Sequence, residues 1–379
     1  MPIEPLRIEL VRGLDAFERL AEGWDDLVIA MRRPSPFLLH DLCATWWSRP
    51  EASEQPVIAV AHRGQRLVAA LALEVRHVGA VRIASFPGRH SSALADMLLA
   101  PDEPPETARA LLSCLDDAPF DLAWLYGLPA GSTLASAAAG RLKLSERVES
   151  PVLEMPGGFD EILRTHVRGD HRRGRQRHLR QLAEQDTVEF TLAKGADDLV
   201  RDLPAAFDLM ARRREGLPDD SGFTTPEGRR YYLALARRLG PTGHLQLLTL
   251  RLDGTPIAFE LFYLVGTTMV FSMIAFEPGL RRFSPGKLAF YEANAQGSAG
   301  GARRIELLGR LDQYKRELHP ELAPLFIGVG LAQGTRGRAA GAALWLLVDG
   351  RRRARDSARL RRLYVEGLAP LRRLRKRAS

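Results

Sequence analysis

The chain contains 379 residues, 45% of them apolar and 26% charged, which is typical of a globular protein large enough for two domains. Its formal net charge of +8 is unevenly distributed. Residues 351–379 carry twelve cations against two anions, a net of +10, which leaves the preceding 350 residues at −2. The sequence pI of about 9.8 therefore does not identify the whole chain as a nucleic-acid binder.

Cysteine and histidine give little support for a redox or metal site. Cys43 and Cys114 lie in unrelated contexts without a Cys-x-x-Cys pair, so we expect neither a disulfide framework nor a zinc ribbon. The nine histidines include no His-Glu-x-x-His or His-x-x-x-His pair. We predict that both cysteines are small core residues and that no metal is bound.

The sequence contains no evident leader or membrane anchor. Its start, MPIEPLRIEL, carries Glu4 and Glu9 early, unlike a signal peptide. The longest apolar run near the end covers residues 339–348, about half of the ~20 residues that a membrane helix needs. We therefore expect a cytoplasmic protein.

The first third of the chain alternates between strand and helix patterns. Arg63-Gly64 is the hairpin signal, and the last strand is apolar throughout, as a buried central strand would be. The expected elements are a strand at 6–12, a helix at 17–31, strands within 56–86, a helix at 106–118 and a strand at 120–128.

The second half repeats this order. The expected elements are three strands within 244–276, a basic loop, a helix at 284–299 and a strand at 303–309. Asp253-Gly254 and Gly266 mark the two turns. Gly64 precedes Trp124 by 60 residues, and Gly254 precedes Leu307 by 53. This near-equal spacing predicts an internal duplication of one unit of antiparallel hairpin, helix and strand.

A strongly basic segment, residues 165–185, lies between the two copies. Gly169 and Gly174 interrupt its first part, and residues 175–185 have a helical pattern. One interpretation is a solvated connecting helix. The other is a contact to a phosphate or polyanion, because the planar guanidinium of arginine suits phosphate oxygens. The candidate substrate-binding residues in this segment are Arg172, Arg175 and His178.

The loop before the helix at 284–299 is a candidate anion site. Serine is a preferred N-cap and proline a preferred first helical residue, so Ser284-Pro285 marks a helix start. Gly286 would allow close approach of a ligand to the backbone, and a helix N-terminus attracts phosphate. The alternative is a capped surface helix with solvated cations. The candidate cofactor-binding residues are Arg281, Arg282, Phe283, Ser284, Pro285, Gly286 and Lys287.

The segments FEPGLRRFSPGKL and RIELLGRLDQYKREL resemble a known family, the cellulose-biosynthesis-associated acetyltransferases (CelD/BcsL-like). These are related to the FemABX peptidyltransferases, which have two tandem GNAT folds. The family's Ser-Pro-Gly step maps to 284–286, its acidic strand end to Glu306, its glycine to Gly309 and its Tyr-Lys pair to Tyr314-Lys315. The resemblance covers roughly residues 10–325, with specific motifs only in 275–318.

The resemblance implies an α/β fold of two tandem GNAT-like units with mixed, mainly antiparallel sheets. It implies acetyl-CoA or another acyl-CoA as co-substrate, with its pyrophosphate on the loop at 281–287, and a bacterial protein of polysaccharide biosynthesis. We expect residues 1–150 to form a degenerate N-terminal copy that helps to build the acceptor cleft. We expect residues 151–325 to form the acyltransferase domain and residues 326–379 a basic amphipathic tail.

Acyl transfer needs a base for the nucleophile and an acid for the leaving thiolate. Glu260 is a charged residue in an otherwise apolar strand, and burial would raise its pKa toward that of a useful base. By the resemblance, Tyr314 would protonate the thiolate. Asp312 and Lys315 are candidates for binding the acceptor or the coenzyme. The alternatives are an outward-facing glutamate, a packed tyrosine ring and a solvated loop.

The tail places leucines among arginines, a pattern found in helices that bind anionic lipid surfaces and in helices that pack on their own domain. Three functions remain open. The first is an acyl-CoA-dependent N- or O-acetyltransferase acting on a sugar, an envelope precursor or a small molecule. The second is a Fem-like peptidyltransferase that uses aminoacyl-tRNA, the only reading with a nucleic-acid partner. The third is a non-catalytic scaffold of polysaccharide biosynthesis at the inner membrane.

Overall fold

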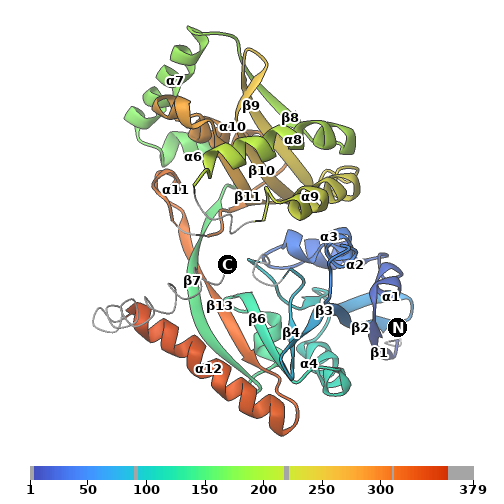
Figure 1. The fold of residues 1–379 in the computed structure, drawn as a ribbon. Coiled ribbons are helices and arrows are strands. Elements are labelled where there is room, and N and C mark those ends of the chain that lie inside the picture. Colours follow the sequence, from blue (N-terminus) through green and yellow to red (C-terminus); the bar gives the residue numbers. More distant parts are fainter. Residues whose placement is uncertain (1–3, 89–92, 217–221, 310, 357–379) are drawn as a thin grey trace.

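The computed structural model describes residues 4–88, 93–216, 222–309 and 311–356. Within this part of the chain, thirteen strands form one mixed sheet, and helices pack on both of its ends (Figure 1). Residues 357–379 of the predicted amphipathic tail lie outside the described residues. Among the helices of the described part, none is both long and apolar enough to cross a membrane.

The N-terminal copy begins with a strand, followed by short helices, a β-meander, a helix and a parallel strand. Its elements are β1 Leu6–Arg12, α1 Leu14–Glu18, α2 Trp24–Ile29, η1 Pro36–Leu38, α3 His40–Trp47, β2 Gln55–Arg63, β3 Arg66–Val78, β4 Val81–Ser85, β5 Leu98–Leu99, α4 Pro105–Ser113, η2 Cys114–Asp117, β6 Leu122–Pro129, α5 Thr133–Ala137 and β7 Leu142–Glu154.

The C-terminal copy repeats that order after two connecting helices. Its elements are α6 Phe159–Thr165, α7 Gly169–Ala183, β8 Val188–Ala193, α8 Ala196–Arg213, α9 Pro226–Leu239, β9 Leu245–Leu252, β10 Thr255–Val265, β11 Thr268–Phe276, η3 Pro278–Phe283, α10 Pro285–Ala299, β12 Arg304–Glu306, α11 Gln313–Arg316, β13 Glu321–Gly330 and α12 Gly334–Asp356.

The predicted duplication is confirmed by the strand order β1-β2-β3-β4-β6-β13-β7-β12-β11-β10-β9-β8. Each copy contributes an antiparallel meander and a strand that pairs in parallel with the meander's last strand, β6 with β4 and β12 with β11. The copies also exchange their final strands. β7 of the first copy pairs with β12 of the second, and β13 of the second pairs with β6 of the first.

The expected domain limits, positions 150 and 325, both fall inside the exchanged strands, β7 and β13. Residues 326–353 are not a separate tail. They complete β13 and form most of α12, which packs on β4, β6, β7 and β13 through Leu344, Trp345 and Val348. The apolar run at 339–348 therefore belongs to the fold of the N-terminal half (Figure 1).

The basic segment also differs from its predicted form. Gly169 and Gly174 do not interrupt it, because α7 runs as one helix from Gly169 to Ala183. Leu182 is buried and Leu179 packs against the C-terminal core, so one apolar stripe anchors α7. Burial of that stripe outweighs the modest helix propensity of glycine.

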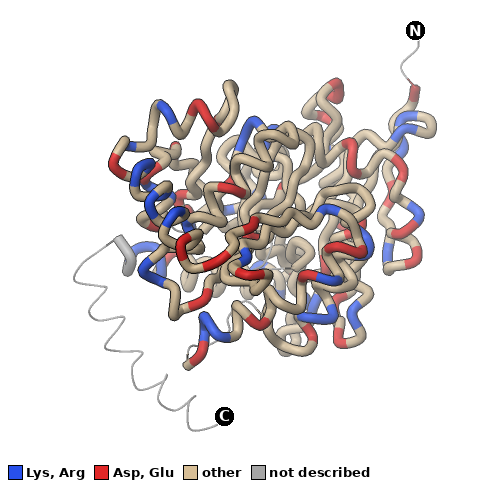
Figure 2. The backbone as a smooth tube through the Cα atoms, turned by 90° about the horizontal axis from the view of Figure 1, so that it is seen from above, with Lys and Arg blue, Asp and Glu red and all other residues tan. Residues whose placement is uncertain are grey.

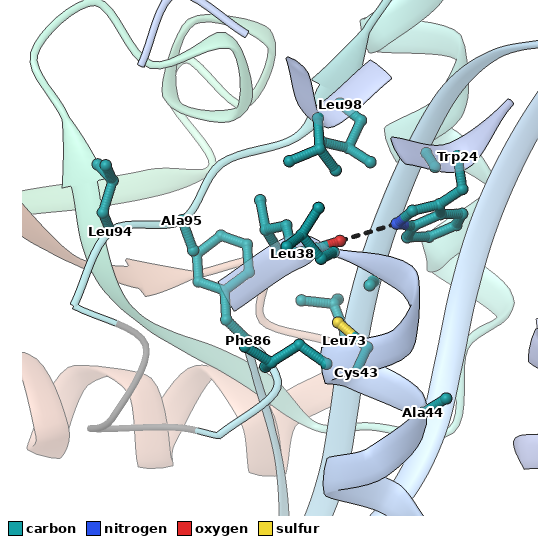
Figure 3. Packing of buried hydrophobic residues seen from close by; sticks show 14 of the residues in the cluster. Trp24, Leu38, Cys43, Ala44, Leu73, Phe86, Leu94, Ala95 and Leu98 are labelled. Atoms are coloured by element: carbon teal, nitrogen blue, oxygen red, sulfur yellow. Dashed lines mark hydrogen bonds between the residues drawn. The ribbon is translucent and has the colours of Figure 1, made fainter. Parts of the chain in front are cut away.

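One buried apolar cluster runs through both halves, from Phe17 and Trp24 to Phe207 and Phe259, and a second cluster surrounds α10 in the C-terminal half. In the N-terminal half, Phe17, Trp24 and Trp47 pack edge to face, and the Trp24 Nε1–H donates to the Leu38 carbonyl at 2.8 Å (Figure 3). Cys43 is fully buried there, as predicted, whereas Cys114 is only partly buried. The C-terminal core joins α10 to the sheet through Phe290, Phe271 and Phe262.

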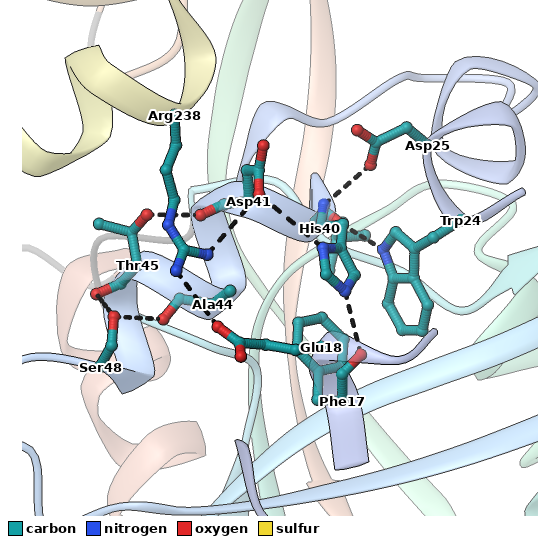
Figure 4. Close-up of polar contacts among 11 residues, drawn as sticks. Phe17, Glu18, Trp24, Asp25, His40, Asp41, Ala44, Thr45, Ser48 and Arg238 are labelled. Atoms are coloured by element: carbon teal, nitrogen blue, oxygen red, sulfur yellow. Dashed lines mark hydrogen bonds and ion pairs between the residues drawn. The ribbon is translucent and has the colours of Figure 1, made fainter. Parts of the chain in front are cut away.

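Polar contacts link the two halves at several places. Arg238 of α9 reaches the N-terminal half, where it contacts Glu18 at 3.2 Å and Asp41 at 3.7 Å (Figure 4). On the other side, Arg33 forms a buried bidentate pair with Glu306 of β12, at 2.8 and 2.7 Å. These contacts fix the opening between the halves.

Candidate active site

A cleft of about 920 Å³ lies between the two halves. Its N-terminal wall comes from η1, α3 and the segment that follows α3, and its C-terminal wall comes from α8, α9, β11 and the chain after β12. The lining includes Phe37, Trp46, Arg49, Glu51, Arg213, Arg214, Glu227, Tyr231, Tyr232, Tyr263, Phe271, Ser272, Met273, Ile274, Leu307, Leu308, Gly309, Asp312, Tyr314 and Lys315. Aromatic rings and charges of both signs therefore face one space.

The cleft reaches into the sheet because β11 and β12 separate. Their parallel pairing covers only three positions, from Thr268 with Arg304 to Val270 with Glu306. Beyond that point β11 continues for six residues without β12, and its residues 271–274 line the cleft opposite Leu307–Gly309. A bulge between β10 and β11 at Leu261/Phe262 lies beside this gap.

Glu260 lies on β10 behind this gap and is fully buried, so it is not an outward-facing residue. Among the described residues, neither of its carboxyl oxygens has a hydrogen-bond partner. Burial raises the pKa of Glu260 well above its ordinary value, and the opposing effect of the Lys315 charge is smaller. A buried carboxyl without hydrogen bonds lowers the stability of the fold, so its presence makes Glu260 a candidate functional residue.

Lys315 is also buried, with 4% of its surface exposed, so it does not belong to a solvated loop. Its Nζ donates to the carbonyls of Leu307 and Leu308 at 3.1 and 2.9 Å, which holds the chain that lines the cleft. Burial lowers the pKa of Lys315, against the effects of Asp312 and Glu260. The pKa values of Glu260 and Lys315 are thus shifted toward each other.

Tyr314 lies beside this pair in the cleft lining. Its ring packs edge to face on Phe290 of α10, with centroids 4.8 Å apart. Tyr314 therefore both packs against α10 and lines the cleft. Burial, with the charges of Glu260 and Asp312, raises the pKa of the phenol, which therefore stays protonated at neutral pH. Asp312 lines the cleft as the N-cap residue of α11.

The loop at 281–287 forms η3 and the start of α10. Ser284 is the N-cap and Pro285 the first helical residue, but Ser284 has φ of 52° and makes no side-chain cap. The amides of Gly286 and Lys287 precede the first helical bond, from Leu288 N–H to the Ser284 carbonyl. A Cβ on Gly286 would lie 2.8 Å from the Phe276 ring, so this glycine serves packing rather than an open approach.

The cations of this loop differ in their surroundings. Lys287 is ion-paired with Glu317, which also accepts from the Tyr291 hydroxyl at 3.1 Å and lies 3.1 Å from His171. Arg281 and Arg282 are exposed, and the Arg282 guanidinium lies 4.6 Å from the ring centroid of Phe283, which is buried.

The three candidates on α7 lie away from the cleft. Arg172 donates to the carbonyls of Leu163 and Arg164 at 2.7 and 2.8 Å, which caps the C-terminal end of α6. Arg175 lies 3.6 Å from Glu292 of α10. His178 lines a separate hollow with Arg282. The structure therefore brings Glu260, Asp312, Tyr314 and Lys315 together and leaves the α7 residues outside that group.

Sequence reasoning did not identify Glu74, a second fully buried carboxyl, on β3. Its Oε2 accepts from the indole N–H groups of Trp46 and Trp47 at 2.8 and 3.1 Å, and Trp46 lines the cleft. The signal was present, because Glu74 interrupts the apolar run RLVAALALEV just as Glu260 interrupts its own strand. Burial raises the pKa of Glu74 from 4.5 to about 7.

Glu74→Gln should remove a pH-dependent contribution to stability. The folded state holds this proton to a higher pH than the unfolded state, so the stabilisation is complete below about pH 4.5 and is lost as pH rises toward 7. The shift corresponds to roughly 3 kcal/mol. Urea unfolding of wild type and variant at about pH 5 and about pH 8 should show the wild type losing more stability with pH. Parallel pH profiles would contradict the assignment.

Comparison with known proteins agrees with this architecture. The family model described as "Acetyltransferase (GNAT) domain" matches residues 169–316. No curated protein matches the chain at significant similarity.

Among the described residues, no group of three or more His, Cys, Asp or Glu side chains could hold a metal ion.

Three solved structures are similar in fold. FemX superposes with a TM-score of 0.61 at 12% identity, over 81% of this chain and 95% of its own. A C-terminal domain from Agrobacterium fabrum, proposed to be part of a lysylphosphatidylglycerol synthetase, gives 0.52 at 14% identity, over 87% and 95%. L-PGS from Bacillus licheniformis gives 0.50 at 11% identity, over 87% and 94%.

The fold and the matched domain define the class of the protein. The chain consists of two tandem GNAT-like folds that share one mixed sheet. The acetyltransferase domain that the family model describes lies in the C-terminal copy, which also contains the separated strands β11 and β12 and the buried Glu260.

Proposed function

We propose that the protein is an acyl-CoA-dependent N- or O-acyltransferase, with acetyl-CoA as the donor. The observation that carries this proposal is the buried carboxyl of Glu260, without a described hydrogen-bond partner, beside Lys315 and Tyr314 where β11 and β12 separate. A GNAT domain implies an acyl-CoA co-substrate in general. The thioester supplies an activated acyl group, which the acceptor's nitrogen or oxygen attacks.

The chain's own residues provide the two proton transfers that this reaction needs. In our proposal the Glu260–Lys315 pair takes up the proton of the acceptor. Burial raises the pKa of Glu260 and lowers the pKa of Lys315, which brings the proton affinities of the two groups closer together. Tyr314 donates its proton to the leaving thiolate, since its raised pKa keeps the phenol protonated until then.

The start of α10 fits the phosphates of the donor. The amides of Gly286 and Lys287 precede the first helical bond, and the helix N-terminus carries partial positive charge. Arg281 and Arg282 add exposed cations. Because Phe276 fills the space over Gly286, contact would come from these amides and the arginines, not from a gap left by the missing side chain.

The acceptor belongs in the interdomain cleft, where Trp46, Tyr231 and Tyr232 present aromatic surface and Glu51 and Glu227 present carboxylates. This lining suits a hydroxylated or amino-bearing acceptor. With the resemblance to the CelD/BcsL-like family, it favours a sugar or envelope precursor of bacterial polysaccharide biosynthesis. We further propose a cytoplasmic enzyme, peripheral to the inner membrane through the basic C-terminal residues.

Similarity to FemX favours a second candidate, transfer of an aminoacyl group from tRNA. The basic helix α7 would then contact RNA, with a strong salt dependence. A non-catalytic scaffold is the third candidate. The two donors separate in one experiment, isothermal titration of the purified protein with acetyl-CoA, with free coenzyme A and ATP as controls. Saturable binding of acetyl-CoA at micromolar concentration supports the acyl-CoA-dependent acyltransferase. Absence of binding at millimolar concentration would exclude it.

Arg281→Ala combined with Arg282→Ala should weaken acetyl-CoA binding by about a hundredfold or more, because each lost charge-assisted contact to phosphate is worth about 1.5–3 kcal/mol. Both side chains are exposed, so the fold should persist. Arg66→Ala, which removes an exposed arginine of the N-terminal half, is the matched control. An unchanged dissociation constant in the double variant would remove the loop from the donor site.

A further inference from the structure

A second hollow, of about 580 Å³, lies between α7 and η3, next to the start of α10. One wall consists of α7 residues and the other of Arg282 and Phe283 from η3. It is separate from the interdomain cleft, with which it shares no lining residue. The residues that line it are Arg177, His178, Gln181, Glu184, Gln185, Arg282 and Phe283.

The cations of this hollow are not neutralised, in contrast to their neighbours. Within the described residues, neither Arg177 nor Arg282 forms an ion pair, whereas Arg175 pairs with Glu292 and Lys287 with Glu317. Charges of both signs are otherwise interspersed over the chain (Figure 2). Two unneutralised guanidinium groups on facing walls are suited to one phosphate, because each can donate two parallel hydrogen bonds.

The charged groups that act on His178 are cations. The pKa of His178 is lowered, first by partial burial and then by the charges of Arg177 and Lys287. The only acidic side chain in the lining is Glu184, at the C-terminal end of α7. Glu184 lies seven residues, or ~10 Å along the helix, beyond Arg177. The hollow is thus cationic at one end and carries amide and carboxylate groups at the other.

This arrangement of cations at one end of the hollow and hydrogen-bonding groups at the other suits a nucleotide. Arginines at one end suit a phosphate, and Gln181, Glu184 and Gln185 offer hydrogen-bonding groups for the edge of a base at the other. A lone inorganic anion would use only the cationic end.

We propose that this hollow binds a nucleoside phosphate, the 3′-phosphoadenosine end of coenzyme A, with Arg177 on the 3′-phosphate. This inference rests on the proposed function for the identity of the donor. The start of α10, proposed to hold the donor's pyrophosphate, directly follows Arg282 and Phe283 in the chain. Coenzyme A would therefore extend from the interdomain cleft past the start of α10 to α7.

The test is the affinity of the full chain for adenosine 3′,5′-bisphosphate, measured by isothermal titration. Arg177→Ala should weaken binding by about fivefold or more through loss of a charge-assisted contact. Arg173→Ala, a change of an exposed arginine on the same helix that does not line the hollow, should leave it within about twofold. Wild type should also prefer coenzyme A to 3′-dephospho-coenzyme A, and Arg177→Ala should lose that preference.

The alternative results separate this inference from the proposed function. If acetyl-CoA binds but Arg177→Ala keeps the full preference for the 3′-phosphate, the assignment of the hollow to the 3′-phosphoadenosine group is wrong. The assignment of acetyl-CoA as the donor then stands. If adenosine 3′,5′-bisphosphate binds through Arg177 but acetyl-CoA does not bind, the hollow stands and the proposed function falls. Equal affinity for uridine 5′-diphosphate, or Arg177-dependent binding of tRNA without binding of free nucleotide, would overturn the adenosine assignment.

Discussion

Glu306→Ala should lower the free energy of unfolding by about 3–5 kcal/mol, the usual cost of removing one partner from a buried ion pair. Glu306 is fully buried and Arg33 is 7% exposed. The carboxylate accepts two hydrogen bonds from Arg33 and a third from Arg304 Nε at 3.1 Å. Without it, the Arg33 guanidinium remains buried with no carboxylate to balance its charge, and one of the polar links between the two halves is lost.

Urea unfolding followed by circular dichroism measures this cost. Asp102→Ala is the matched control, because Asp102 forms a bidentate pair with Arg66 at 2.7 and 2.9 Å but is 61% exposed. That solvent-exposed pair should contribute little to the free energy of unfolding, because water and salt screen it. Glu306→Leu combined with Arg33→Met should recover most of the loss, since apolar residues of similar volume often replace buried pairs at little cost. Equal effects of Glu306→Ala and Asp102→Ala would show that burial does not decide the strength of this contact.

The duplication could be predicted from the sequence because its signals are local. The Asp253-Gly254 turn has both residues at positive φ, as the hairpin signal implied, and Ser284-Pro285 does begin a helix. Glu260 stood out because a charge in an apolar strand is unusual at any register. Each of these inferences needed only neighbouring residues.

The features that could not be predicted depend on contacts between residues that are far apart in the chain. Arg33 and Glu306 are separated by 273 positions, and nothing near Arg33 shows that its partner is a strand of the other copy. The exchange of β7 and β13 is likewise invisible locally, so the domain limits were placed inside those strands. The space beside Gly286 could not be predicted either, because Phe276, which fills it, lies on β11.

Glu260→Met should make the protein more stable and less active. Methionine has a similar length and no polar group, so it removes a buried carboxyl that has no described hydrogen-bond partner. The free energy of unfolding should rise by about 1–3 kcal/mol at neutral pH. Lys315 keeps its bonds to the Leu307 and Leu308 carbonyls, so its own polar group stays satisfied. Loss of the proton-accepting pair should reduce acyl transfer by ~10²–10⁴-fold.

Glu74→Met is the matched control, because Glu74 is a fully buried carboxyl on β3, the strand of the other copy that is equivalent to β10. Its loss leaves the indole N–H groups of Trp46 and Trp47 without their acceptor, so this variant should be destabilised by about 1–3 kcal/mol. Urea unfolding and release of the coenzyme A thiol, with an acceptor that the wild type turns over, measure the two effects. Full turnover by the Glu260→Met variant would exclude Glu260 from the proton transfers. A loss of stability equal to that of Glu74→Met would mean that Glu260 has polar partners in the fold and is a structural residue.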